Sequence, residues 1–268
     1  RVEGFARRGE TADAADRLGV ADRVSTELES VVADAELVIL CTPVEHMRTV
    51  LEPVLGALRR GAIVTDVGSV KLQVVRELEP MVSGAGLHFI GSHPMAGGER
   101  IGVNRARADL FDHAVCAITP TPQSNDPAIE RVAGFWEGLG MRLLRLTPEL
   151  HDELVSRASH LPHLVASALA GYVLDPEFPG EQRDLCAGGF RDATRIASGP
   201  VAMWRGILSA NRENLVRDID GLTARLNDLR AALADNDPQT IEELLKQAHD
   251  RREHWLSGDT IFRTHGPA

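Results

Sequence analysis

AELVILC at residues 35–41 and AIVT at residues 62–65 are short, continuously apolar runs that end at loop residues. Such runs are typical of strands buried on both faces of a parallel sheet. Three more β-type runs follow, at residues 87–90, 114–118 and 141–146. Amphipathic segments, such as residues 46–58 and 70–82, lie between the runs. This alternation predicts a doubly wound α/β domain over residues 1–146.

Only helices are predicted after residue 146. Thr147 can cap a first helical turn, Pro148 needs no N–H partner there, and Pro162 should kink the helix that follows. Apolar residues then recur at alternating intervals of four and three: Leu215, Ile219, Leu222, Leu226, Leu229 and Leu233. That spacing is typical of a coiled-coil seam, which packs within one chain or forms part of a dimer interface. The sequence therefore predicts an all-helical domain over residues 147–268.

The charge balance excludes one class of partner. The 268 residues include 29 basic and 39 acidic side chains, for a net charge of −10. Nucleic-acid binding needs a basic surface, whereas a local arginine pocket for a small anionic substrate fits an acidic protein. No apolar run reaches the roughly 18 residues of a membrane helix, and the first residues do not form an export signal, so we expect a cytoplasmic protein with no membrane segment. Cys41, Cys116 and Cys186 are odd in number and unclustered, and we expect buried free thiols.

Unusual residues follow three of the strand-type runs. They are Cys41-Thr42-Pro43, Asp66-Val67-Gly68-Ser69-Val70-Lys71 and Gly91-Ser92-His93-Pro94-Met95-Ala96-Gly97-Gly98. Ligands bind beyond the C-terminal ends of strands in open α/β sheets, so these segments predict a binding cleft. His93 is interpreted as functional because Pro94 restrains it and the neighbouring glycines allow close backbone approach. Ser69 caps the next helix, faces the cleft, or does both, and Lys71 is interpreted as a solvated residue of the first helical turn.

The helical half carries two polar segments, SHLPH at residues 159–163 and GGFRDATRIA at residues 188–197. His160 and His163 share a helix face, but no third ligand is evident, so no metal site is predicted. Arg191 and Arg195 are four residues apart on one helical face. They form surface ion pairs, or they offer planar guanidinium groups to a substrate carboxylate.

Five segments together resemble the prephenate/arogenate dehydrogenase family of tyrosine biosynthesis. They are DVGSVK at 66–71, GSHPMAG at 91–97, PELHD at 148–152, SHLPH at 159–163 and GFRDATRIA at 189–197. The resemblance implies a Rossmann-type nucleotide-binding domain, an all-helical substrate-binding domain through which subunits form a homodimer, and NAD or NADP as cofactor. The implied reaction is oxidative decarboxylation of prephenate to 4-hydroxyphenylpyruvate or of arogenate to tyrosine.

The same resemblance implies roles for individual residues. His93 accepts the proton of the substrate's C4 hydroxyl while hydride passes to the nicotinamide. Ser69 orients His93 and touches the hydroxyl or the nicotinamide. Substrate-binding residues are implied at His163, Arg191, Arg195 and Gly98. Cofactor-binding residues are implied at Arg7, Arg8, Cys41, Thr42, Pro43 and Ser69.

The chain departs from the family pattern at three places. Val2–Phe5 reads as the second strand of the nucleotide-binding unit, so the first strand and its glycine-rich phosphate turn are absent, and we expect weak cofactor binding. Ala6 replaces the acidic residue expected to bind the ribose of NAD, and the Arg7-Arg8 pair that follows favours NADP through its 2′-phosphate. Gly98 replaces a small hydroxyl residue before Glu99, which leaves inhibition by tyrosine open. No regulatory domain is expected after the helices.

Two other functions are weighed against this one. Another β-hydroxyacid dehydrogenase would share the layout, but such enzymes usually use a catalytic lysine in the helical domain, and Lys246 lies far along the chain from the arginine pair. A non-catalytic, dimeric nucleotide-sensing protein would explain the missing glycine turn but not the set of Ser69, His93, His163 and Arg195. The sequence does not choose between prephenate and arogenate.

Overall fold

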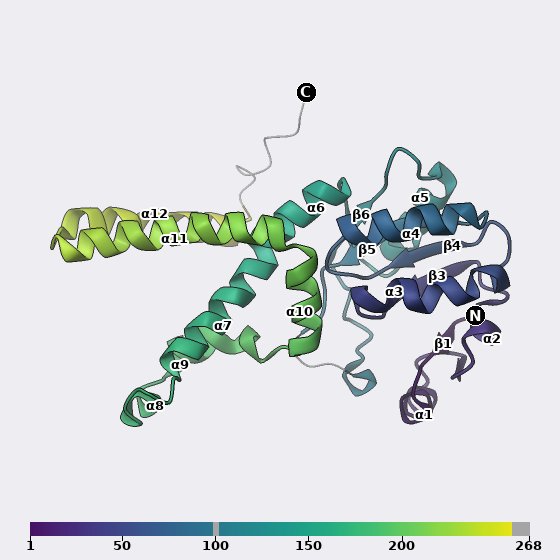
Figure 1. The fold of residues 1–268 in the computed structure, drawn as a ribbon, viewed down its shortest axis with the longest axis horizontal. Helices are drawn as coiled ribbons and strands as arrows, with labels where there is room; N and C mark the ends of the chain where they lie inside the picture. The colour runs from purple at the N-terminus through teal and green to yellow at the C-terminus, as the bar shows by residue number, and fades with distance from the viewer. Residues whose placement is uncertain (99–101, 259–268) are drawn as a thin grey trace. The chain divides into compact units, whose positions relative to one another are not determined.

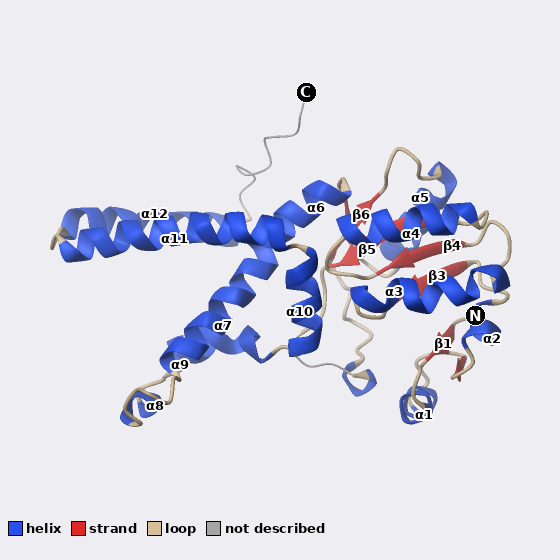
Figure 2. Ribbon diagram, in the orientation of Figure 1, coloured by secondary structure: helices blue, strands red, loops and turns tan. Residues whose placement is uncertain are grey.

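The strands form two sheets in the computed structural model, which describes residues 1–98 and 102–258. A two-stranded parallel sheet joins β1 (Glu3–Phe5) to β2 (Arg23–Ser25). The five-stranded sheet has the order β3 (Leu37–Leu40), β4 (Ile63–Asp66), β5 (His88–Pro94), β6 (Val115–Thr119) and β7 (Arg142–Arg145). All five predicted apolar runs therefore form strands of one sheet. Figure 2 shows β3 to β6 of this sheet in red.

The predicted parallel sheet is wrong at one pair of strands. β5 and β6 run antiparallel, with Gly91 opposite Thr119, whereas the other neighbours in the five-stranded sheet are parallel. A parallel pair needs a crossover connection, usually a helix. The described part of the link between β5 and β6 carries only the 3-10 helix η2 (Val103–Arg105), so the chain returns in the opposite direction.

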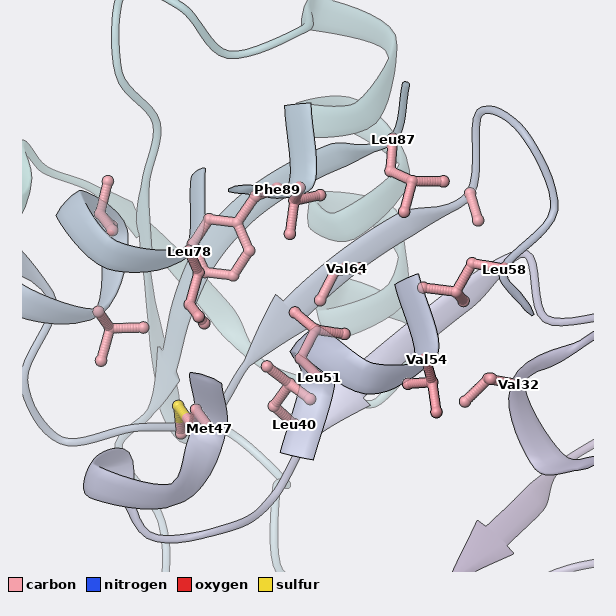
Figure 3. Packing of buried hydrophobic residues seen from close by; sticks show 14 of the residues in the cluster. Val32, Leu40, Met47, Leu51, Val54, Leu58, Val64, Leu78, Leu87 and Phe89 are labelled. Carbon is pink, nitrogen blue, oxygen red and sulfur yellow. The ribbon is translucent and has the colours of Figure 1, made fainter. Parts of the chain in front are cut away.

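Helices cover both faces of the five-stranded sheet (Figure 1). They are α3 (Val44–Leu51), which continues into the 3-10 helix η1 (Glu52–Ala57), α4 (Leu72–Gly84) and α5 (Asp126–Gly138); α1 (Gly9–Arg17) and α2 (Leu28–Val32) accompany the small sheet. On one face, Val64 and Phe89 pack in a cluster with Leu51 and Leu78 (Figure 3). Ile90 points to the other face and packs in a second cluster with α5. Burying one such side chain contributes about 1.5–3 kcal/mol, so the two clusters hold the helices firmly against the sheet.

Residues 148–210 form helical segments joined by loops, with no strand, as predicted. The segments are α6 (Pro148–Val155), the π-helix η3 (Ser156–His160), α7 (Leu161–Val173), α8 (Glu181–Asp184), α9 (Gly188–Thr194), the 3-10 helix η4 (Arg195–Ser198) and α10 (Val201–Ala210). The expected cap is confirmed, because Thr147 Oγ1 accepts a hydrogen bond from Leu150 N at 3.2 Å. The interruption expected at Pro162 takes the form of the π-helix just before it, where the widened turns accommodate a residue that has no N–H.

The chain divides into two compact units, residues 1–215 and 216–268. The second unit consists of most of α11 (Arg212–Ala234) together with α12 (Pro238–Leu256), which run side by side (Figure 1). Asp237 caps α12, because its Oδ1 accepts hydrogen bonds from Gln239 N and Thr240 N at 3.1 Å. Leu222 and Leu229 of the predicted seam are half-buried, whereas Ile219, Leu226 and Leu233 are exposed. The seam is thus only partly covered within the unit.

The cysteines differ from the expectation of buried thiols. Cys116, inside β6, is buried, and burial raises its pKa to about 12. Cys41 is exposed because it follows the last residue of β3, and Cys186 is half-buried. All three are free. No helix of the described residues is long and apolar enough to cross a membrane.

Candidate active site

The predicted polar segments do meet at one edge of the five-stranded sheet. β3, β4 and β5 run parallel over their paired residues, so their C-terminal ends lie together. Thr42 follows β3, Asp66 ends β4, and His93 lies near the end of β5. This edge therefore carries the candidate site.

Lys71 is the main correction to the predicted site. It is completely buried rather than solvated, and its ammonium forms an ion pair with Asp66. The Lys71 Nζ also donates a hydrogen bond to the carbonyl of Ser92 at 2.7 Å. Burial lowers the pKa of Lys71, and the Asp66 carboxylate opposes that shift. Lys71 contacts both partners because Asp66, in β4, and Ser92, in β5, lie at the same edge of the sheet.

Asp66 and Ser92 lock the end of β5 beside His93. One Asp66 oxygen accepts the backbone N–H of Ser92 at 3.1 Å, and the other accepts that of Gly68 at 2.8 Å. The Ser92 hydroxyl donates to the Asp66 carbonyl at 2.6 Å and accepts the indole N–H of Trp136 at 3.1 Å. The residue before His93 is therefore held by its N–H, its carbonyl and its side chain.

His93 lies in a buried chain of three side chains. Its Nδ1 is 3.0 Å from Nε2 of His151, and Nδ1 of His151 is 2.8 Å from an oxygen of Asp152. Only 7% of His93 is exposed, and His151 and Asp152 are buried more completely. The Nδ1 of His93 thus has His151, from α6, as its partner; the orienting role that the resemblance implied for Ser69 stays a prediction.

Asp152 also caps α4 from a distance. Its two carboxylate oxygens accept the backbone N–H groups of Lys71, at 2.7 Å, and Leu72, at 3.0 Å. α4 begins at Leu72, so the alternative in which Ser69 caps this helix is wrong. The free N–H groups of a first helical turn favour a carboxylate, which explains why a buried aspartate is stable here.

His160 and His163 surround the same region from η3 and α7. Asn211 Nδ2 donates to the Asp152 carbonyl at 2.8 Å and lies 3.1 Å from His160 Nδ1. Burial lowers the pKa of His160 to about 4, so its ring is neutral at pH 7. His163 stacks on Trp204 with ring centres 3.5 Å apart and an angle of 10° between the planes. Sequence reasoning missed Trp204, because no local pattern distinguishes it.

The electrostatic surroundings keep His93 neutral. Burial lowers the pKa of His93 well below 6.5, and His151, Lys71 and His160 lower it further. Burial also lowers the pKa of His151, although the Asp152 carboxylate opposes that shift. A neutral imidazole at a strand end can accept a proton from a bound hydroxyl group, which is general-base chemistry.

The remaining predicted site residues outside the arginines differ in how far they are buried. Ser69 is half-buried between β4 and α4, and its backbone lies beside His160. Thr42 has a buried hydroxyl with no hydrogen-bond partner in the described structure, while Cys41 and Pro43 are exposed. Gly98 is exposed, and Glu99 lies outside the described residues.

The predicted arginines are all exposed. Arg7 and Arg8 follow β1 of the small sheet, where Arg8 precedes the first turn of α1. Arg191 lies in α9, which ends at Thr194, and Arg195 begins η4. The two therefore belong to successive helical segments, an α-helix and a 3-10 helix, and their placement on one face stays a prediction. In the described parts of the chain, no three His, Cys, Asp or Glu side chains are placed to bind a metal ion.

Comparison with known proteins gives consistent matches over nearly the whole chain. The family model for the prephenate dehydrogenase nucleotide-binding domain matches residues 1–145, and the model for the prephenate dehydrogenase dimerization domain matches residues 147–247. A prephenate dehydrogenase of Bacillus subtilis is 34% identical over 256 residues, covering 94% of this chain and 68% of the relative.

Two solved structures are similar as well. The crystal structure of prephenate dehydrogenase from Aquifex aeolicus, in complex with hydroxyphenyl propionate and NAD+, has a TM-score of 0.87 and 32% identity, covering 94% of this chain and 88% of that one. The Synechocystis arogenate dehydrogenase has a TM-score of 0.79 and 27% identity, covering 94% and 90%.

Proposed function

The chain belongs to the prephenate dehydrogenase family, and from this membership we propose how its own residues carry the reaction. It is a prephenate/arogenate (cyclohexadienyl) dehydrogenase of tyrosine biosynthesis, with an α/β nucleotide-binding domain followed by a helical dimerisation domain. This assignment favours the dehydrogenase over the two alternative functions that the sequence left open.

We propose His93 as the general base. The observation that carries this role is a buried, neutral imidazole at the end of β5 whose Nδ1 is already engaged by His151, so that Nε2 is left for the substrate. His93 takes the proton of the C4 hydroxyl as the carbonyl forms. Loss of CO₂ then makes the ring aromatic, which drives the reaction forward, so the protein mainly positions the substrate and removes one proton.

The cofactor is proposed to lie along the strand ends. The buried Thr42 hydroxyl has no partner in the described structure and fits a polar group of a dinucleotide, and Cys41, Pro43 and Ser69 adjoin it along the strand ends. The bound nicotinamide supplies the hydride acceptor. Arg7 and Arg8 are exposed at the end of β1, where they would favour the 2′-phosphate of NADP over NAD. The ratio of kcat/KM for NADP and NAD tests this preference.

The substrate's carboxylate is proposed to be bound from the helical part. His163 is held flat against Trp204, and its buried Nδ1 has no partner in the described structure, so it is available to a ligand. Arg195 is exposed and offers a planar pair of donors, with Arg191 and Gly98 as further candidate contacts. Side-by-side assays with prephenate and arogenate determine which substrate is used.

A homodimer is proposed through the helical domain. Ile219, Leu226 and Leu233 leave one side of the seam exposed, and residues 147–247 match the family's dimerization domain. We expect a dimer by sedimentation equilibrium and a monomer for Leu226→Glu. We also propose a cytoplasmic location, as suits an enzyme of amino-acid biosynthesis that uses a nicotinamide cofactor.

The decisive experiment replaces the base. His93→Asn should lower kcat by at least about 100-fold, as expected for loss of a general base. His88→Asn, at the opposite end of β5, is the matched control and should leave kcat unchanged. Near wild-type turnover of the His93 variant would overturn the proposed role.

A further inference from the structure

We propose that His151 is a positioning residue that sets the tautomer of His93. In this arrangement His151 Nε2 accepts the Nδ1–H of His93, which leaves the lone pair of His93 Nε2 for the substrate hydroxyl. The inference deepens the proposed function, because it rests on His93 being the base. It follows from three hydrogen-bonding steps that begin at Asp152.

Asp152 can only accept hydrogen bonds. Two of its contacts come from the backbone N–H groups of Lys71 and Leu72, whose protons are fixed. The third contact, 2.8 Å from His151 Nδ1, must therefore be donated by the imidazole. His151 carries a proton on Nδ1.

His151 then has a lone pair on Nε2. A neutral imidazole carries one proton, and a second one is disfavoured because the ring is completely buried and the Lys71 ammonium is near. Nε2 of His151 lies 3.0 Å from Nδ1 of His93, within hydrogen-bond distance. Since His151 accepts in this contact, His93 must donate, and its own single proton lies on Nδ1.

The remaining nitrogen of His93 is the one that acts. With the proton on Nδ1, Nε2 presents a lone pair and can take up the hydroxyl proton of the substrate. The opposite tautomer would present an N–H at Nε2 and could not act as a base. A second proton on His151 would enforce that inactive tautomer, because both nitrogens of His151 would then donate.

The same chain stabilises the product of proton uptake. Once Nε2 of His93 gains the proton, both of its nitrogens are donors, and the Nδ1–H already points to His151. The positive charge is then connected through one neutral ring to the Asp152 carboxylate, with no further proton transfer. The other titratable groups near His93 include Lys71, which is paired with Asp66, His160, which is neutral, and the Cys116 thiol of β6, whose pKa burial raises to about 12.

The first test reads the tautomer directly in the wild-type protein. Long-range ¹H–¹⁵N correlation spectra at pH 7.5 distinguish a protonated Nδ1 from a protonated Nε2, and the His93 signals are assigned by their loss in His93→Gln. We expect the Nδ1–H form. A neutral His93 protonated at Nε2 would overturn the inference, whatever the outcome of any variant.

The second test compares two replacements of His151. His151→Gln keeps an acceptor for His93 and a donor for Asp152, whereas His151→Leu keeps neither. We expect the leucine variant to lower kcat by at least about 100-fold with little change in KM, because a wrong tautomer is catalytically severe in the Ser-His-Asp triad as well. The glutamine variant should keep most of the wild-type kcat and should retain the Nδ1–H signal of His93. Equal kcat values for both variants would contradict the inference.

The two tests separate this inference from the proposed function. If the wild-type protein oxidises neither prephenate nor arogenate at saturating NAD or NADP, the proposed function fails while the tautomer measurement still stands. If it is active but His93 is protonated at Nε2, only the role of His151 fails.

Discussion

Lys71 and Asp66 form an ion pair in which neither side chain has any exposed surface. Removing one partner of a buried pair leaves an uncompensated charge, which costs about 3–5 kcal/mol. Lys71→Met should therefore lower the free energy of unfolding by that amount. The only other lysine of the chain, Lys246, forms an exposed pair with Asp250, so Lys246→Met is a control with the same chemical change and an expected cost of at most about 1 kcal/mol. If urea unfolding shows the same loss of free energy for the Lys71 and Lys246 variants, burial does not make the Lys71–Asp66 pair more important.

The acid limb of activity should lie at unusually low pH. The free-enzyme pKa of His93 is lowered well below 6.5 by burial, and only the neutral ring can accept a proton. kcat/KM should therefore stay high as pH falls through 6.5 and decline only below it. A pH profile measured at saturating cofactor checks this. An acid limb of kcat/KM centred above pH 6.5 would show that the His93 imidazole is not in the buried, neutral state.

Arg195 should act mainly on substrate binding. Arg195→Ala should raise KM by roughly 10- to 100-fold with a smaller change in kcat, as expected for loss of a charge-assisted hydrogen bond to a carboxylate. Arg183→Ala, an exposed arginine in α8, serves as the control and should change neither constant. An unchanged KM in the Arg195 variant would remove this residue from the substrate site.

Gly91 should not tolerate a side chain. A Cβ at this position of β5 would lie 2.5 Å from the Thr119 hydroxyl oxygen and 3.1 Å from a methyl group of Val75. Gly91→Ala should therefore cost about 1–3 kcal/mol through overpacking, two residues from His93. Gly134→Ala in α5 meets no atom within 4 Å and should stabilise the protein by about 0.5–1 kcal/mol. Thermal unfolding of the two variants should shift in opposite directions.

His160 should make the protein sensitive to mild acid. Its pKa is about 4 in the folded protein against 6.5 for an ordinary histidine, so the unfolded chain binds the proton first and stability is lost as pH falls from 6.5 towards 4. Between pH 7 and pH 5 this one group should cost about 2 kcal/mol. His160→Asn keeps an acceptor for Asn211 and cannot titrate, so its unfolding free energy should fall less over this range. If the unfolding free energies of the wild-type protein and the His160→Asn variant fall equally with pH, His160 is not the group responsible.

The strands could be predicted because their signal is local. Each apolar run, such as residues 62–65, is continuous in the sequence and forms a strand where expected. His93 could be singled out as a candidate for the same reason, since its glycine and proline neighbours adjoin it, and its role stays a prediction. The sequence also indicated the Thr147 cap, where the capping residue directly precedes its helix.

The contacts that complete the site could not be predicted, because they join distant residues. Lys71 resembles an ordinary first-turn lysine until the sheet brings the Ser92 carbonyl to its ammonium. The cap of α4 lies 80 positions away from Leu72, at Asp152, so a search for a capping residue beside the helix selects Ser69 instead. The stacking of His163 on Trp204 likewise depends on how α7 and α10 pack.

Because α4 and the residue that caps it, Asp152, are 80 positions apart, the helix is synthesised before its cap. The ribosome releases residues 72–84 before residue 152 is made, so the carboxylate that caps α4 and the ring partner of His93 are not yet available when these segments emerge. Contacts of such high sequence separation form late, after local helices and hairpins. On the proposed roles of His93 and His151, a nascent chain that has folded its nucleotide-binding part alone would not yet be able to remove the substrate's proton.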